Sequence, residues 1–252
     1  MLLDKINLCF LLTLFVLTNS YAQSEKISID YSMRVNQGIQ KELSASLEFK
    51  DGVSIYKWNN TENKSETSQD DFGNSKFYVD VTDSIGTVNM VNYHTDSIYS
   101  RSLRFKNSIV LVEKKPQFDW KITDETKKIG EFTVQKATTQ FRGRNYEAWF
   151  TPEIPIKIGP WKLNGLPGLI LEAYDLDGIV HFNFQKAKTS DKALAYNAEI
   201  FDDGKIVGVE EFEQLQNDLA DDMLRKIMAK MPRGTSISID QKTETFLEKE
   251  YK

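Results

Sequence analysis

The sequence predicts a mainly β protein with one C-terminal helix, an α+β fold in which the helix packs on a curved antiparallel sheet or half-barrel. Three observations predict this class. Between residues 26 and 190, apolar and polar residues alternate with a period of two, and turn residues separate the alternating segments. Residues 209–231 instead show the three- and four-residue spacing of an amphipathic helix. Four of the six prolines lie within residues 152–167, and each removes a backbone donor that a central strand needs.

The chain begins with a predicted signal peptide, residues 1–22. Lys5 precedes an apolar block at residues 8–17, and small residues stand at the positions that signal peptidase reads before a cut between Ala22 and Gln23. The block is shorter than the roughly 20 apolar residues that span a bilayer, and no later stretch approaches that length. We therefore expect an exported mature chain without a transmembrane segment, in the periplasm or outside the cell.

The composition excludes several classes of function. The formal net charge of −5 leaves no excess of cations with which to bind nucleic acid. The single cysteine, Cys9, lies in the signal peptide, so disulfides and thiolate metal sites are not expected in the mature chain. The sequence contains neither a phosphate-binding glycine loop nor a dinucleotide fingerprint, so no cofactor is expected.

Residues 23–234 are predicted to form a single β-rich domain. Residues 27–31 alternate cleanly, and residues 43–49 and 53–58 flank Asp51-Gly52, a pair that accepts the positive φ angles of a tight hairpin turn. Residues 59–74 are polar and are predicted to form a surface loop. Further strands are predicted at 76–82, 87–93, 97–105, 108–114, 120–123, 131–141, 145–151, 169–175 and 179–187.

The predicted helix covers about residues 209–231. Its apolar stripe is expected to pack on a sheet face, and acidic residues in its first turn match the helix dipole. Pro232 and Gly234 end it. Residues 235–252 are a polar C-terminal tail that we expect to be only loosely attached.

The proline-rich stretch, residues 149–171, is too apolar to remain in water. It either folds over the open end of the β structure as a plug or lines a groove that receives an apolar ligand or partner. Pro167-Gly168 within it suits a type II turn, with glycine at the positive φ position. The groove alternative predicts these binding residues: Trp149, Phe150, Ile154, Trp161, Leu166, Pro167 and Leu169.

Catalytic signals are weak, and no catalytic or metal-binding residue is assigned. His94 with Asp96 is at most a two-point metal site, and no Gly-x-Ser-x-Gly turn positions a nucleophile. Residues 175–178 resemble part of a calcium loop but lack its later ligands, so a hairpin turn is predicted. An enzyme would have to use the remaining candidates, which are Glu153, Glu172, His94 and His181.

One block of the proline-rich stretch carries a family resemblance. Gly165-Leu-Pro-Gly-Leu-Ile170 is the signature of the GLPGLI family of exported proteins, found mainly in Bacteroidota, and the sequence resembles this family. The resemblance extends upstream through residues 120–130, 135–137, 141–144 and 148–155. It implies an exported, β-rich, single-domain protein of a Bacteroidota-type cell envelope, and it implies no settled activity or catalytic residues.

The sequence leaves three hypotheses open. Two of them are classes of function, and the third is a structural module without a binding or catalytic site. The first is a non-enzymatic envelope protein, a carrier or adaptor that binds an apolar ligand or an outer-membrane protein partner through residues 149–171. The alternative is a periplasmic hydrolase or metal-dependent enzyme, which requires its candidate side chains to converge in one pocket. In the third, a purely structural module, the apolar stretch is entirely internal.

Overall fold

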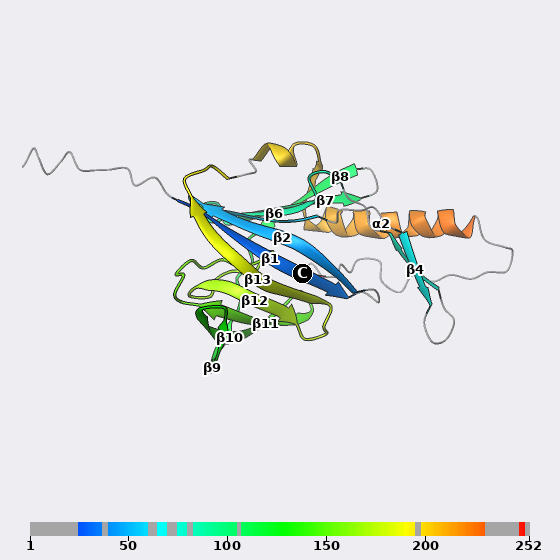
Figure 1. Ribbon diagram of the computed structural model, residues 1–252. Helices are drawn as coiled ribbons and strands as arrows, with labels where there is room; N and C mark the ends of the chain where they lie inside the picture. The colour runs from blue at the N-terminus through cyan, green and yellow to red at the C-terminus, as the bar shows by residue number, and fades with distance from the viewer. Residues whose placement is uncertain are drawn as a thin grey trace, which may run out of the picture.

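The computed structural model describes residues 25–36, 40–59, 65–69, 75–79, 83–104, 107–194, 198–229 and 247–249. The predicted signal peptide, residues 1–22, lies outside the described residues, as does most of the predicted tail. In the described part the fold is mainly β with a single α-helix, as the sequence predicts (Figure 1). None of the helical residues described there form a segment long and apolar enough to cross a membrane.

One large open sheet holds twelve strands. Neighbouring strands are antiparallel except for the parallel pair β14–β8. The chain runs from β1 in the middle of the sheet to β8, which is second from one edge, then continues at the opposite edge with β9 and returns to β13 beside β1. In spatial order the strands are β14 (Lys205–Val207), β8 (Asn107–Lys114), β7 (Ser97–Arg104), β6 (Thr87–Asn92), β3 (Val53–Trp58), β2 (Gln40–Lys50), β1 (Lys26–Asn36), β13 (Val180–Ser190), β12 (Leu169–Asp175), β11 (Arg144–Thr151), β10 (Phe132–Phe141) and β9 (Lys121–Ile129).

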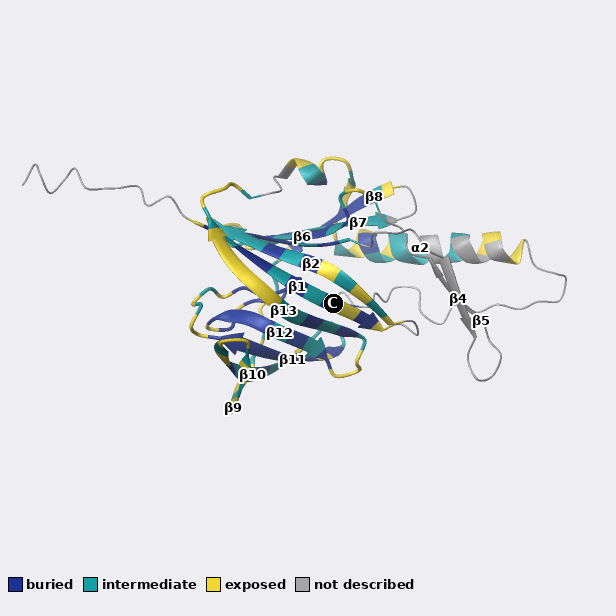
Figure 2. Cartoon of the chain, in the orientation of Figure 1, coloured by how far each residue is buried: buried dark blue, intermediate teal, exposed yellow. Residues whose placement is uncertain are grey.

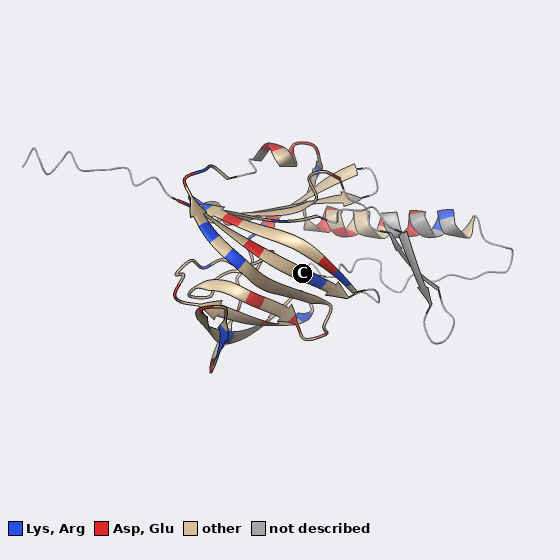
Figure 3. Cartoon of the chain, viewed as in Figure 1, with Lys and Arg blue, Asp and Glu red and all other residues tan. Residues whose placement is uncertain are grey.

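The period-two pattern places apolar residues on one face of the sheet. In β1, Ile29, Tyr31 and Met33 are buried, whereas Ser32 and Arg34 lie on the other face. Charged residues of both signs are interspersed on β1 and β2, whereas the charged residues of β13 are lysines (Figure 3). The predicted β2–β3 hairpin is confirmed, with positive φ angles at both residues of the turn, Asp51 and Gly52.

The prediction of a surface loop at residues 59–74 is wrong in part. Residues Ser65–Gln69 form β4, which pairs antiparallel with β5 (Ser75–Val79) in a separate two-stranded sheet. β4 contains no apolar residue, so it gives no alternation signal, although its backbone pairs as well as that of any strand. Residues 60–64 and 70–74 of the predicted loop lie outside the described residues.

Residues 152–168, which we call the covering segment, connect β11 to β12 and pack onto the main core. Ile158, Trp161, Leu163 and Leu166 are all buried in that core (Figure 2 shows the burial along the chain). Backbone groups of the segment are paired without a strand, since Ile154 O and Ile158 O accept from Leu169 N and Ile170 N, each at 3.0 Å. This burial agrees with the plug alternative for the apolar stretch.

The type II turn predicted at Pro167-Gly168 is wrong. Gly168 is not among the glycines with positive φ, and its N–H donates to Leu166 O at 2.8 Å across a three-residue turn. Glycine is required here for another reason. A Cβ atom at this position would lie 2.1 Å from Thr151 O, so the backbones approach too closely for any side chain.

The helix α2 (Val209–Met228) packs against the sheet at its β14–β8 edge. Phe212 is buried against Ile109, Leu111 and Val207, and Val209 and Leu215 pack around this contact. The helix begins at the predicted residue and ends three residues before Met231. A single 3-10 turn, η1 (Ala198–Phe201), precedes β14.

Candidate functional site

The seven binding residues predicted in the apolar stretch lie in different environments. Five are buried in the main core, namely Trp149 (8% exposed), Phe150, Trp161, Leu166 and Leu169, whereas Ile154 is half-buried and Pro167 is exposed. Trp149 differs from the others because its ring lies among charged side chains, with Lys127 Nζ 4.2 Å from the ring centroid. Ligand binding by these residues stays a prediction.

Of the four residues considered for an enzyme, two meet. Glu172 on β12 and His181 on β13 are diagonal neighbours across the strand pair, and Glu172 Oε1 lies 2.8 Å from His181 Nε2. Glu153 is elsewhere and accepts from Thr133 N at 2.8 Å. His94 lies in the turn after β6, where its Nε2 is 2.9 Å from Asp51 O.

Glu172 and His181 belong to a cluster on the face of the sheet opposite Ala148, Ala173 and Phe182, which we call the outer cluster. Lys127 also pairs with Glu172, and Glu147 accepts from Tyr174 and from Trp149 Nε1 and pairs with Lys136. The members are Lys127, Lys136, Glu147, Trp149, Glu172, Tyr174 and His181. It is therefore a cluster in which each carboxylate has several donors.

The carboxyl groups of the outer cluster are held in their ionised form. Burial alone would raise the pKa of Glu172, but the hydrogen bonds from His181 and Lys127 outweigh it and lower that pKa. Burial is likewise outweighed at Glu147, where hydrogen bonds from Tyr174 and Lys136 lower the pKa. A general acid at neutral pH needs a raised pKa, so neither carboxyl group suits that role. No group of three metal-binding side chains occurs among the described residues.

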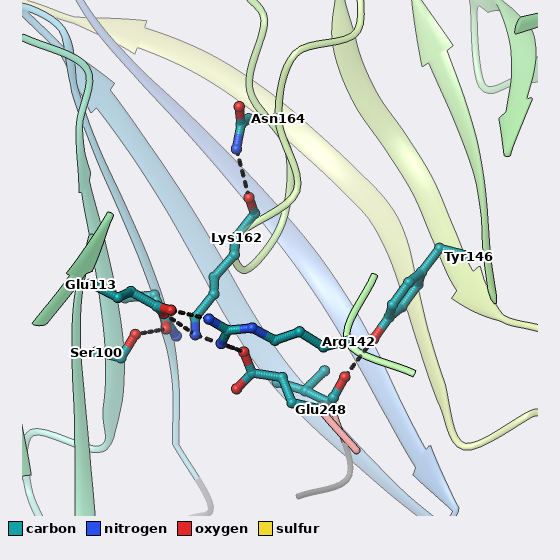
Figure 4. A network of polar contacts seen from close by, with 9 residues as sticks. Ser100, Glu113, Arg142, Tyr146, Lys162, Asn164 and Glu248 are labelled. Atoms are coloured by element: carbon teal, nitrogen blue, oxygen red, sulfur yellow. Dashed lines mark hydrogen bonds and ion pairs between the residues drawn. The ribbon is translucent and has the colours of Figure 1, made fainter. Parts of the chain in front are cut away.

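A second set of charges lies inside the molecule, and we call it the buried charge network (Figure 4). It consists of Glu113 at the end of β8, Arg142 in the β10–β11 turn, Lys162 in the covering segment and Glu248 near the C-terminus. Lys162 Nζ pairs with both carboxylates, at 2.8 Å from Glu248 Oε1, and Arg142 pairs with both as well. The side chain of Lys162 is only 2% exposed and that of Glu113 only 3%.

Electrostatic balance explains how Glu113 and Arg142 remain ionised. Burial alone would raise the pKa of Glu113, but Lys162 and Arg142 outweigh it and hold that pKa below its ordinary value. Burial alone would lower the pKa of Arg142, and Glu248 and Glu113 more than compensate. Among these four described side chains two cations face two carboxylates, and Glu248 supplies one of the two negative charges.

Local geometry positions Arg142 and the chain beside it. Arg142 and Gly143 have φ angles of 45° and 75°, which make the tight turn between β10 and β11. The following residue, Arg144, pairs at 2.9 Å with buried Asp175. Asp175 Oδ1 in turn accepts from Ile179 N and Val180 N, which closes the turn at residues 175–178. This turn confirms the predicted hairpin at a place that resembled part of a calcium loop.

Residues 247–249, which lie three residues before the end of the printed sequence and which we call the C-terminal tripeptide, are firmly held, so the loose attachment expected for the tail is wrong for them. Leu247 is buried in the main core, and its carbonyl accepts from Tyr146 Oη at 2.8 Å. Lys249 N donates to Arg142 O at 3.0 Å, and Lys249 Nζ lies 2.7 Å from Asp177. The sequence signal that was missed is the adjacent apolar pair Phe246-Leu247, in a tail whose other apolar residues, Ile237, Ile239 and Tyr251, stand singly.

Comparison with known proteins gives a short family match. A family model described as "Protein of unknown function (Porph_ging)" matches residues 141–172, the stretch that includes Arg142, Lys162 and the whole covering segment. This stretch also contains the Gly165–Ile170 block. No curated protein matches the chain.

The likenesses to solved structures are distant. A structure of PNGF-II in space group P21 has a TM-score of 0.52 at 17% identity, over 76% of this chain and 33% of that one. An uncharacterized conserved protein from Thermus thermophilus has a TM-score of 0.40 at 12% identity, over 73% and 90%. A putative outer membrane lipoprotein-sorting protein domain from Vibrio parahaemolyticus has a TM-score of 0.27 at 7% identity, over 71% and 90%. The chain spans about a third of the length of PNGF-II, and that likeness concerns the fold alone.

Proposed function

We propose that the protein is a non-enzymatic binding protein, a carrier or adaptor of the cell envelope, exported after cleavage near Ala22-Gln23. Its partner is an apolar ligand or an outer-membrane protein. The binding site lies where the covering segment meets the buried charge network. The single observation that carries this proposal is Lys162, a buried cation that an apolar segment brings into contact with carboxylates from two other parts of the chain.

The energetics of buried charges favour a role in recognition. Removing two ions from water costs several kcal/mol each, and well-packed apolar residues often replace a buried ion pair without loss of stability. A network of four charges is therefore a poor way to fill a core. It is a good way to recognise a charged group that is attached to an apolar body, because Lys162 lies beside the Trp161 ring and its chain neighbour Leu163 is buried in the main core.

We propose further that the sheet of this single domain curves into a half-barrel, and chain length supports this. Lys114 ends β8 and Lys121 begins β9, so seven residue steps join the second and twelfth strands of the sheet. Seven extended steps reach about 25 Å at most. Ten strand spacings in a flat sheet measure about 48 Å, so the two edges must approach one another.

The predicted binding residues take different parts in this arrangement. Phe150, Trp161, Leu166 and Leu169 form the apolar wall behind the network. Ile154 and Pro167 lie nearer the solvent, where a partner would reach them. Trp149 belongs to the outer cluster.

Native mass spectrometry of the processed protein, isolated from the envelope fraction of the cells that express it, tests the proposal. We expect a bound molecule that organic extraction or a partner-dissociating wash removes. The variant Lys162→Met should lose it, and Lys188→Met, at an exposed site on β13, should keep it. Circular dichroism verifies that both variants are folded. An empty wild-type protein would contradict the proposal.

An enzyme remains the second candidate because Glu172 and His181 are in hydrogen-bond contact. Such an enzyme would be a periplasmic hydrolase or a metal-dependent enzyme that uses these two residues without Glu153 and His94. A hydrolytic activity of the wild type that both Glu172→Gln and His181→Asn abolish would establish it.

A further inference from the structure

We infer that the C-terminal tripeptide is an internal occupant of the binding site, and that the site takes a peptide in which an apolar residue precedes an acidic one. The inference rests on the proposed function and names the chemistry of its partner and the regulation of its site. The four residues that hold the tripeptide, which we call the seat, are Arg142, Tyr146, Lys162 and Asp177.

The contacts of the tripeptide have the form of peptide recognition. The Leu247 side chain enters the apolar core, and the Glu248 carboxylate meets two cations. Backbone groups on both sides of Glu248 are also bound, by Tyr146 Oη and by Arg142 O. Side-chain pockets give such a site its specificity, and main-chain hydrogen bonds add affinity for any extended peptide.

The seat is built from elements that do not include the tripeptide. Its members come from β11, the turn before it, the turn after β12 and the covering segment. Arg142 and Glu248 are 106 residues apart in the chain. The described contacts of the tripeptide include no strand pairing, so the strand pairings of the main sheet do not involve it.

Charge balance determines what can replace the tripeptide. Glu248 is one of the two carboxylates that both Arg142 and Lys162 contact, so its departure removes one negative charge from a buried place beside these two cations. An uncompensated buried charge is strongly unfavourable, so a replacement must bring a negative group. The replacement must also carry an apolar group next to its negative group, to fill the buried position of the Leu247 side chain.

A peptide fits these requirements better than a fatty acid does. Both offer a carboxylate and an apolar group. Only a peptide also offers a carbonyl for Tyr146 Oη and an N–H for Arg142 O, placed on either side of the acidic residue. The Asp177 carboxylate, at 2.7 Å from Lys249 Nζ, favours a basic residue next in the sequence.

The test adds a separate peptide that has the chain's own sequence around the tripeptide. A fluorescent peptide of residues 243–252 is titrated into full-length protein, and binding is followed by fluorescence anisotropy. In the double variant Leu247→Asp/Glu248→Lys the chain's own tripeptide no longer fits the seat. We expect this variant to bind the peptide at least about ten-fold more tightly than the wild type, because the internal competitor is gone.

Two controls make the result specific. A peptide with glutamine at the Glu248 position should lose most of its affinity, and Lys162→Met introduced into the double variant should abolish binding. The milder single variant Glu248→Gln provides the same comparison with a smaller change to the fold, and circular dichroism verifies folding throughout.

The inference would be overturned if the wild type, the double variant and Glu248→Gln all bound the peptide equally, or if none of them bound it. Preferential binding of oleate over the peptide would also overturn it, in favour of a fatty acid. A native protein that carries a ligand although no variant binds the peptide leaves the proposed function standing without the inference. If the native protein is empty but the double variant binds the peptide, the peptide site is supported and the proposed carrier function is not.

Discussion

Leu166 is the residue at which the covering segment meets the core, and its side chain is 1% exposed. Replacing it with alanine removes buried methyl groups and leaves a cavity that the surrounding backbone can only partly fill. We expect Leu166→Ala to lower the free energy of unfolding by about 2–5 kcal/mol, as measured by urea denaturation. Leu176→Ala is the matched control, since Leu176 is 61% exposed and should change stability little. Equal effects of the two changes would contradict the burial of the segment.

Glu113 makes the folding stability of the protein depend on pH in the acid range. Its folded-state pKa is lowered by Lys162 and Arg142 against the effect of burial, while the unfolded chain has the ordinary value of about 4.3. The stabilisation is therefore present above about pH 4.3 and is lost as pH falls through the folded pKa, because the unfolded state then binds more protons.

Denaturation at several pH values checks this effect. We expect Glu113→Gln to cost about 3–5 kcal/mol at pH 7, where it breaks a buried ion pair, and to flatten the loss of stability below about pH 4.3. Profiles that run parallel for wild type and variant would contradict the assignment.

At the scale of elements, the covering segment depends on a close backbone contact. Gly168→Ala would place a Cβ atom 2.1 Å from Thr151 O and force the segment away from β11. We expect a loss of about 3 kcal/mol or more in thermal or urea unfolding. Gly208→Ala is the control, because nothing lies within 4 Å of its added Cβ atom. A neutral Gly168→Ala would show that the segment is packed differently.

The sequence predicts elements well where the signal is local. Alternation within β1 and the Asp51-Gly52 turn each depend on a few adjacent residues, and both are confirmed. β4 was missed because a polar strand has no alternation. The turn at Gly168 was misassigned because its glycine is required by Thr151, seventeen positions away in the chain, rather than by its own φ angle.

The candidate site was predicted only in its apolar part. The proline-rich stretch is recognisable by its composition, and Leu166 and Trp161 are both in it. The network was missed because its four charges are ordinary surface-type residues in the sequence, separated by up to 135 positions between Glu113 and Glu248. Only the sheet order, which places the strands after β9 beside β1, brings them together.

At the scale of the whole molecule, the central claim is that the two ends of the sheet meet over the covering segment, where the buried charge network joins them. Cys9 is the single cysteine of the sequence, which allows a direct test. Spin labels are attached to cysteines introduced at Lys114 on β8 and Asn145 on β11, both exposed, in a chain that carries Cys9→Ser. These strands are eight positions apart in the sheet, which corresponds to about 38 Å if the sheet is flat.

Pulsed electron paramagnetic resonance then measures the distance between the labels. The curved sheet predicts one narrow distribution well below that flat-sheet value. A broad distribution, or one centred at or above it, would contradict the meeting of the two ends and with it the binding site.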